Sequence, residues 1–283
     1  MKFIFPALAV FGMMTANAGV DRKIPPIDPK VAVFYHLHRQ NIYFKQKQYR
    51  LFIAEPKTPV HNNAILYLLD GNGHFPLALN SVRTDRTLPV IVGIGYPVET
   101  AYAPERRTRD YTFAPEDGKI FKHGGGAEDF LKFIHTSVKP MMEARYSLNK
   151  DKQFLFGHSL GGLFGLYVLF HQPDLFQHYV IASPSIWWKN GGIIPQRLPW
   201  IKSTPRSILI TLGEYEEYPE KDPEITPQRL EKIRQRQRIM PTRYFAGKLI
   251  EQNQPVKFYL IPRANHGQSI LPALQQTLQA VQK

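Results

Sequence analysis

The stretch "FLFGHSLGGLFGLYVL" (154–169) constrains the fold of this chain more than any other segment. It places Ser159 between two apolar runs, with Gly157 and Gly161 completing the pattern G-x-S-x-G. The first run suits a buried strand and the second a helix. A serine on a sharp turn between the two is presented at the N-terminus of the helix, where free N–H groups stabilise negative charge. The stretch therefore predicts a strand–turn–helix unit that exposes a nucleophilic serine, and the alternative is a purely structural turn.

Short apolar runs recur along the rest of the chain and alternate with helical patterns. They lie in "NNAILYLLDGNGHF", "LPVIVGIGYP", "HYVIASPS", "RSILITLGE" and "PVKFYLIP". Continuous apolar runs are typical of parallel strands that are covered on both faces. The run "QNIYFKQKQYRLFIAEP" indicates a hairpin, and "GGGAEDFLKFIHTSVKPMMEARY" a helix after glycines. We expect an α/β fold of the α/β-hydrolase type, with a mostly parallel central sheet and helices on both faces.

The first eighteen residues have the layout of a cleaved signal peptide. Lys2 precedes an apolar stretch from Phe3 to Met14, and Ala16-Asn17-Ala18 supplies a small-residue cleavage site. The alternative, a membrane anchor, needs about 20 apolar residues. We therefore expect export to the periplasm without stable membrane insertion. We also expect a single domain over residues 19–283, because a chain of 283 residues that is 43% hydrophobic can build one large core.

Charge and cysteine content narrow the classes of function. The net charge is +13, or +12 once Lys2 leaves with the signal peptide, which favours an anionic partner, although solubility alone is an alternative explanation. No nucleic-acid-binding pattern accompanies the charge, so we expect a small anionic substrate and no nucleic acid. The chain has no cysteine, which excludes disulfides, thiol catalysis and cysteine-ligated zinc.

A serine nucleophile needs a base and benefits from an acid that orients the base. In the expected chain order of serine, acid and histidine, His266 is the histidine that follows the last predicted strand. The acid should follow the preceding strand, where we select Glu214 because it comes directly after Gly213. The alternatives in the same segment are Glu216, Glu217 and Asp222, or a Ser–His dyad without an acid.

Two backbone N–H groups are expected to stabilise the oxyanion of the tetrahedral intermediate. One belongs to Leu160, the residue after the nucleophile, and the other to Asn72 in the turn "LLDGNGHF", with Gly71 as the alternative. The "HGGG" at 123–126 follows no clear strand, so we interpret it as the lead into a helix. This chemistry needs no metal and no organic cofactor.

Residues 214–254 form a highly charged segment between two predicted buried strands. Its central part, Gln228 to Met240, has the pattern of an exposed amphipathic helix. The segment is either a solvated crossover helix or a basic lid that attracts an anion through Arg234, Arg236 and Arg238.

Several blocks together resemble a known family. "ILYLLDGNGHF", "VIVGIGYP", "RRTRDYTFAP", "FLFGHSLGGLFGLYVLF", "SPSIWW" and "HGQS" are similar to the "Putative esterase" family, which includes esterase D-like proteins and siderophore esterases. The resemblance spans most of residues 30–275. It implies an α/β-hydrolase with Ser159 as nucleophile, His266 as base, and Asn72 and Leu160 as oxyanion donors. It also places Arg107 and Arg109 near the site, either facing the substrate or in a buried salt bridge.

Within that family the chain most resembles exported esterases that cut catecholate trilactone siderophores of the enterobactin or salmochelin type. A ferric tris-catecholate is an anion, which suits the basic chain, and its iron would arrive as part of the substrate. The resemblance implies that Trp187, Trp188 and Tyr215 could stack on catechol rings, although "SIWW" could equally pack in the core. The alternatives are an exported carboxylesterase acting on aryl or carbohydrate-linked esters, and a non-catalytic binding protein on a hydrolase scaffold.

Overall fold

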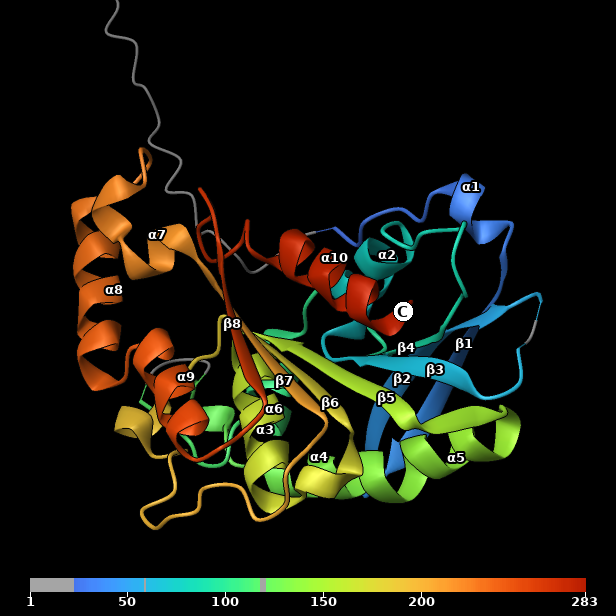
Figure 1. Cartoon of the computed structure of the whole chain (residues 1–283), viewed down its shortest axis with the longest axis horizontal. Helices are drawn as coiled ribbons and strands as arrows, with labels where there is room; N and C mark the ends of the chain where they lie inside the picture. The colour runs from blue at the N-terminus through green and yellow to red at the C-terminus, as the bar shows by residue number, and fades with distance from the viewer. Residues whose placement is uncertain (1–22, 59, 118–120) are drawn as a thin grey trace, which may run out of the picture.

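The computed structural model describes residues 23–58, 60–117 and 121–283, so the expected signal peptide at 1–18 lies outside the described residues. At its centre is an eight-stranded sheet with the order β1-β2-β4-β3-β5-β6-β7-β8 (Figure 1). The strands are β1 Tyr35–Phe44, β2 Lys47–Pro56, β3 Asn63–Leu68, β4 Val90–Gly95, β5 Leu148–His158, β6 His178–Ala182, β7 Ser207–Gly213 and β8 Val256–Ile261.

The pairing of the strands confirms the mostly parallel sheet. β1 and β2 form the expected antiparallel hairpin, and β2 also pairs antiparallel with β4. Every further pair, from β4–β3 to β7–β8, is parallel. The carboxyl ends of six strands therefore meet at one edge of the sheet, which is where open α/β folds place their functional loops.

Helices cover both faces of the sheet, as expected. The helices are α1 Pro29–Ala32, α2 Gly71–Leu79, α3 Pro104–Tyr111, α4 Ala127–Phe133, α5 Lys139–Arg145, α6 Leu160–His171, α7 Glu214–Glu217, α8 Pro227–Ile239, α9 Thr242–Glu251 and α10 Ile270–Val281. Shorter turns are η1 Phe121–His123, the π-helical η2 Ile134–Val138, η3 Pro173–Leu175, η4 Trp188–Gly191 and η5 Pro219–Lys221. Figure 1 shows α2 and α10 on one face and α4, α5 and α6 on the other.

Two hydrophobic cores follow from this arrangement, because successive side chains of a strand point to opposite faces. In β3, Ile65 and Tyr67 pack into the core beneath α4, α6 and α9. Leu66 and Leu68 pack into the core beneath α2 and α10. Both faces are apolar, which explains why these strands have continuous apolar runs rather than an alternating pattern.

The charged segment 214–254 contains α7, η5, α8 and α9. α8 has no buried residue, in agreement with the expected exposed helix. α9 differs, since Phe245, Ala246 and Leu249 are buried in the core under the sheet. The segment therefore joins one exposed helix to one packed helix. Among the described residues no helix is long and apolar enough to span a membrane.

Candidate active site

Ser159 occupies a strained turn between β5 and α6. Its φ of 62° and ψ of −119° lie in a region that non-glycine residues rarely adopt. A Cβ on Gly157 would collide with the carbonyl oxygen of Gly161, so only glycine fits the approach of strand and helix. Two backbone hydrogen bonds hold the turn, from Ser159 N to Ala182 O and from Ser185 N to Ser159 O, both 3.0 Å long. The predicted strand–turn–helix unit is therefore present and presents the serine at the carboxyl edge of the sheet.

His266 lies in the loop after β8 and contacts the serine. Its Nε2 is 2.9 Å from Ser159 Oγ, and its Nδ1 is 2.5 Å from Glu216 Oε2. When Nδ1–H donates to the carboxylate, Nε2 is left to accept the serine proton. The structure thus joins a hydroxyl, an imidazole and a carboxylate from three separate segments in one hydrogen-bonded series, the arrangement of a catalytic triad.

The carboxylate of this series is held by two further donors. Ser183 Oγ donates to Glu216 Oε1 over 2.6 Å, and Gly213 N donates to the same oxygen over 3.0 Å. Burial acts to raise the pKa of Glu216, but the facing His266 and these hydrogen bonds outweigh it and hold the pKa below its usual value. Glu216 therefore stays ionised, which favours the donating Nδ1 of His266.

The acid differs from the sequence expectation, because Glu214 does not reach His266. Glu214 instead accepts a hydrogen bond from Arg263 N over 2.8 Å and one from Lys221 Nζ over 3.2 Å. Both glutamates lie in α7, where residues two apart point to different sides of the helix. A local feature could have distinguished them. Glu216 is three residues after Gly213 and reaches back to its N–H, as a glutamate does in a capping box.

A set of buried polar residues that the sequence did not predict lies next to His266 and Glu216. The hydroxyl oxygens of Ser183 and Ser269 are 3.1 Å apart. The backbone of Ser183 has a positive φ of 41°. Ser269 donates to the carbonyl oxygen of His266 over 2.9 Å and lies 3.3 Å from His158 Nε2. The ring of His158 is 4.6 Å from that of His266, measured between centroids. These contacts restrict the positions of both His266 and Glu216.

The two expected oxyanion donors start neighbouring helices. Leu160 is the first residue of α6 and Asn72 the second of α2, so neither N–H has an acceptor within its own helix. A Cβ on Gly161 would lie 3.4 Å from Leu69 Cβ, so the start of α6 contacts the turn before α2. The Asn72 side chain accepts from Tyr96 N and donates to Tyr96 O, which ties α2 to the end of β4.

Arg107 and Arg109 are both engaged in ion pairs with carboxylates. Arg107 donates twice to Asp70, over 2.7 and 2.8 Å. Arg109 donates twice to Asp110, over the same two distances. Asp70 has a positive φ of 52° and precedes α2, so the first pair supports the turn that carries Asn72. Of the two alternatives stated for these arginines, the geometry favours the salt bridge.

The expected aromatic contacts lie in different surroundings. Trp188 is buried and donates from Nε1 to Ala114 O over 2.8 Å, so it belongs to the core. Trp187 is half-buried, and the guanidinium carbon of Arg236 lies 4.0 Å from the centroid of the Trp187 ring. Tyr215 is half-buried in α7, where its N–H donates to Ala264 O over 3.0 Å. Of these two neighbouring tryptophans, Trp187 is therefore the one that is partly accessible.

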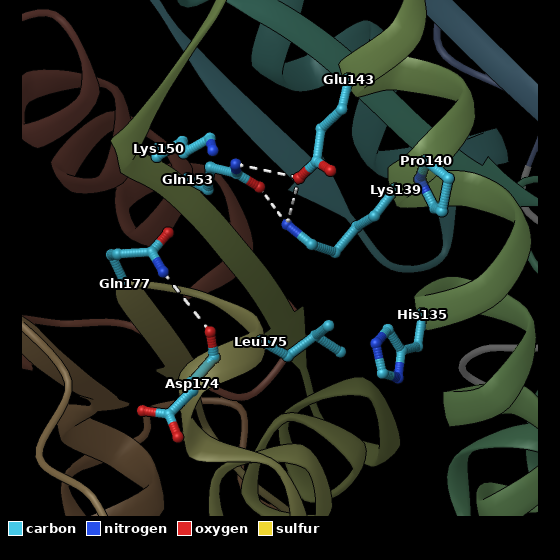
Figure 2. Close-up of a pocket in the computed structure, with 9 residues that line it drawn as sticks. All are labelled: His135, Lys139, Pro140, Glu143, Lys150, Gln153, Asp174, Leu175 and Gln177. Atoms are coloured by element: carbon cyan, nitrogen blue, oxygen red, sulfur yellow. Dashed lines mark hydrogen bonds and ion pairs between the residues drawn. The ribbon is translucent and has the colours of Figure 1, made fainter.

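A separate pocket of about 370 Å³ lies at the opposite edge of the sheet (Figure 2). Its lining includes Lys150 and Gln153, which belong to the first part of β5. Lys139 Nζ contacts Gln153 Oε1 there and lies 3.3 Å from Glu143 Oε1 (Figure 2). None of the residues that line this pocket is a serine or threonine, so it has no counterpart to the Ser159–His266 pair.

Comparisons with known proteins find a matching family, related sequences and similar solved structures. The profile of the family described as "Putative esterase" matches residues 46–243. The chain is 37% identical over 197 residues to the ferri-bacillibactin esterase BesA of Bacillus subtilis (strain 168), covering 62% of this chain and 68% of that protein. It is 36% identical over 181 residues to the siderophore enterobactin esterase of Emericella nidulans, covering 56% and 59%. The solved structure of the siderophore hydrolase EstA from Aspergillus nidulans superposes with a TM-score of 0.71 at 28% identity, covering 91% and 97%.

Proposed function

Because the chain belongs to the "Putative esterase" family and is a hydrolase that acts on esters, we propose that Ser159, His266 and Glu216 are its catalytic triad. The observation that carries the proposal is the continuous series of hydrogen bonds from Ser159 Oγ through the imidazole to Glu216. Glu216 replaces Glu214 in the role expected from the sequence.

In the first half of the mechanism, Ser159 Oγ attacks the carbonyl carbon of the ester while His266 Nε2 takes the hydroxyl proton. Ionised Glu216 stabilises the imidazolium that results. The N–H groups of Leu160 and Asn72 bind the oxyanion of the tetrahedral intermediate. Collapse of the intermediate breaks the ester C–O bond, and the imidazolium gives its proton to the leaving alkoxide.

In the second half, His266 takes a proton from a water molecule that attacks the acyl-enzyme. The new tetrahedral intermediate uses the same two N–H groups. Its collapse releases the carboxylic acid and returns the proton to Ser159. No step requires a group from outside the triad, the two N–H donors and water.

The proposed substrate is a catecholate trilactone siderophore of the enterobactin type, loaded with iron. Two relatives are esterases of siderophores by name, and a solved structure of the same fold is a siderophore hydrolase. The net charge of +13 suits an anionic ferric complex. We further propose export to the periplasm, supported by the layout of residues 1–18.

Labelling with a fluorophosphonate probe tests the catalytic assignment. We expect stoichiometric labelling of the wild-type protein and none of Ser159→Ala, since phosphonylation needs the activated hydroxyl. Equal labelling of the two proteins would disprove the nucleophile. Absence of labelling in both would favour a non-catalytic binding protein.

Chromatography of the products tests the substrate. Ferric enterobactin and a simple aryl ester are incubated separately with the wild-type protein and with Ser159→Ala. We expect linear trimer, dimer and monomer products from the trilactone with the wild type alone. Cleavage of the aryl ester with an intact trilactone would instead identify a general carboxylesterase.

A further inference from the structure

α8 is attached directly to the residue that carries the triad carboxylate. Gln237 Nε2 donates to the backbone carbonyl oxygens of Glu216 and Glu217, over 2.6 and 2.9 Å. Figure 1 shows α8 at one end of the molecule, beside α7 and α9. The half-buried positions of α8 recur at helical spacing and include Ile233, Arg236 and Gln237. The inner face of α8 therefore brings an arginine toward the proposed active site.

Arg236 reaches the site through Trp187. Its guanidinium carbon lies 4.0 Å from the centroid of the Trp187 ring, a close cation–π contact. Trp187 belongs to the loop after β6, in which Ser185 N donates to Ser159 O and Ser185 Oγ lies 3.5 Å from Ser159 Oγ. The loop that holds the ring under Arg236 is thus the loop that contacts the nucleophile through Ser185.

The charge of Arg236 has no carboxylate partner in contact. Within the described ranges, no aspartate or glutamate oxygen lies within 4.0 Å of its guanidinium. The contrast with Arg243 on α9 is informative, because Arg243 forms a bidentate pair with nearby Glu217, over 2.5 and 2.7 Å. An acid is therefore available in this region, but it neutralises a different arginine.

The surroundings of Arg236 disfavour an uncompensated positive charge. Burial lowers the pKa of Arg236 to about 10, and the negative charge of Glu216 only partly opposes this. Lys232, one helical turn earlier, adds a second cation, and the charge of Arg236 in turn lowers the pKa of Lys232. A half-buried cation beside a like charge is stabilised by an anion that binds next to it.

We propose that Arg236, with Lys232 beside it and the Trp187 ring beneath it, is the anion-binding subsite of the active site. It takes a negatively charged, oxygen-rich group of the ester substrate, either a carboxylate or a catecholate. The inference rests on the proposed esterase function and adds to it the residues that select an anionic substrate. Of the three arginines that the sequence suggested for a basic lid, the proposal assigns anion binding to Arg236. Arg234 and Arg238 are exposed, whereas Arg236 is half-buried.

The chemistry of a stacked arginine suits this role. A guanidinium lying on an aromatic face keeps its N–H groups pointing outward in its own plane. Two of these can donate in parallel to adjacent oxygens, which is the geometry of a carboxylate or of the two oxygens of a catecholate. The exposed part of Trp187 then offers an apolar surface to an aromatic ring that carries those oxygens.

Hydrolysis of a matched pair of esters tests the subsite. The neutral probe is p-nitrophenyl hexanoate and the anionic probe is mono-p-nitrophenyl adipate, which differ mainly by a carboxylate. We expect Arg236→Gln to lower kcat/KM for the adipate by about 10-fold, mostly through KM, because one charge-assisted interaction is lost. The same variant should hydrolyse the hexanoate within about 2-fold of the wild type. Arg236→Lys should recover part of the loss, since it keeps the charge without the planar fork.

Arg238→Gln is the control, because it removes the same charge from the exposed face of the same helix. It should leave the ratio of the two kcat/KM values unchanged apart from a small, salt-dependent effect. An equal loss for Arg236→Gln and Arg238→Gln, or an equal loss of both esters in Arg236→Gln, would overturn the subsite while the esterase function stands.

A binding measurement separates this inference from the esterase function. Titration with 2,3-dihydroxybenzoate is followed by tryptophan fluorescence, which needs no turnover. We expect saturable quenching in the wild type and in Ser159→Ala, with Kd raised about 10-fold in Arg236→Gln. Equal affinity of wild type and Arg236→Gln would disprove the subsite, whether or not either ester is cleaved.

Discussion

Glu214 and Glu216 are separated by one residue but have entirely different partners. Glu216 is half-buried, faces His266 and accepts from Ser183 and Gly213. Glu214 bonds to Lys221 and to a backbone N–H near the surface. At the scale of the residue, the short helix α7 decides the difference, because it rotates the two side chains to different sides.

Exchange of each glutamate for glutamine tests this difference. We expect Glu216→Gln to lower kcat for p-nitrophenyl butyrate on the order of 10³-fold, because a neutral amide does not stabilise the imidazolium and can favour the wrong tautomer. Glu214→Gln should remain within about 2-fold of the wild type. Comparable losses in the two variants would contradict the assignment of the acid, provided that circular dichroism shows both to be folded.

At the scale of the element, the turn between β5 and α6 depends on glycine. Gly157 lies so close to the Gly161 carbonyl that a methyl group cannot fit. This close approach was predictable from the sequence, since the G-x-S-x-G pattern and the two apolar runs are local. The position of α8 was not predictable in the same way. Its inner face mixes apolar residues such as Ile233 with Arg236 and Gln237, and its attachment through Gln237 to α7 has no recognisable sequence pattern.

A pair of glycine-to-alanine substitutions tests the steric argument. We expect Gly157→Ala to lower the free energy of unfolding by about 2 kcal/mol and to abolish fluorophosphonate labelling, because the turn must open to admit the methyl group. Gly247→Ala is the control, as its added Cβ would meet nothing within 4 Å in the middle of α9. It should raise the stability by about 0.5–1 kcal/mol. Wild-type stability of Gly157→Ala in urea unfolding would contradict this account.

At the scale of the whole molecule, His266 of the proposed triad lies next to His158, and His158 lies next to His74. His74 is in α2, His158 ends β5 and His266 follows β8. The ring centroids are 6.3 Å apart for His74 and His158 and 4.6 Å apart for His158 and His266. Burial is the main cause that lowers the pKa of His158 well below its usual value, and the charges of His266, His74 and Arg107 add to it. Burial likewise lowers the pKa of His74.

These shifts predict a loss of stability in mild acid. In the unfolded state His158 binds a proton as the pH falls to about 6.5, whereas in the folded state it stays neutral. The free energy of unfolding therefore decreases as the pH falls below about 6.5. This group contributes a decrease of up to about 1.4 kcal/mol per pH unit. His158→Gln should lose less stability than the wild type between pH 7.5 and 5.5 in urea unfolding. The exposed His36→Gln is the control and should follow the wild type. An unchanged pH dependence in His158→Gln would refute the assignment.

The sequence by itself determined the alternation of strands and helices, the turn at Ser159 and the late position of His266. Hydrophobic periodicity and glycine sterics act over a few neighbouring residues, so they can be recognised without a fold. Only the tertiary structure decided that Glu216 rather than Glu214 contacts His266, that Arg107 pairs with Asp70, and that Arg236 lies on Trp187. These choices depend on the direction in which each side chain points and on partners 37 to 50 residues away, and both are set by how the elements pack.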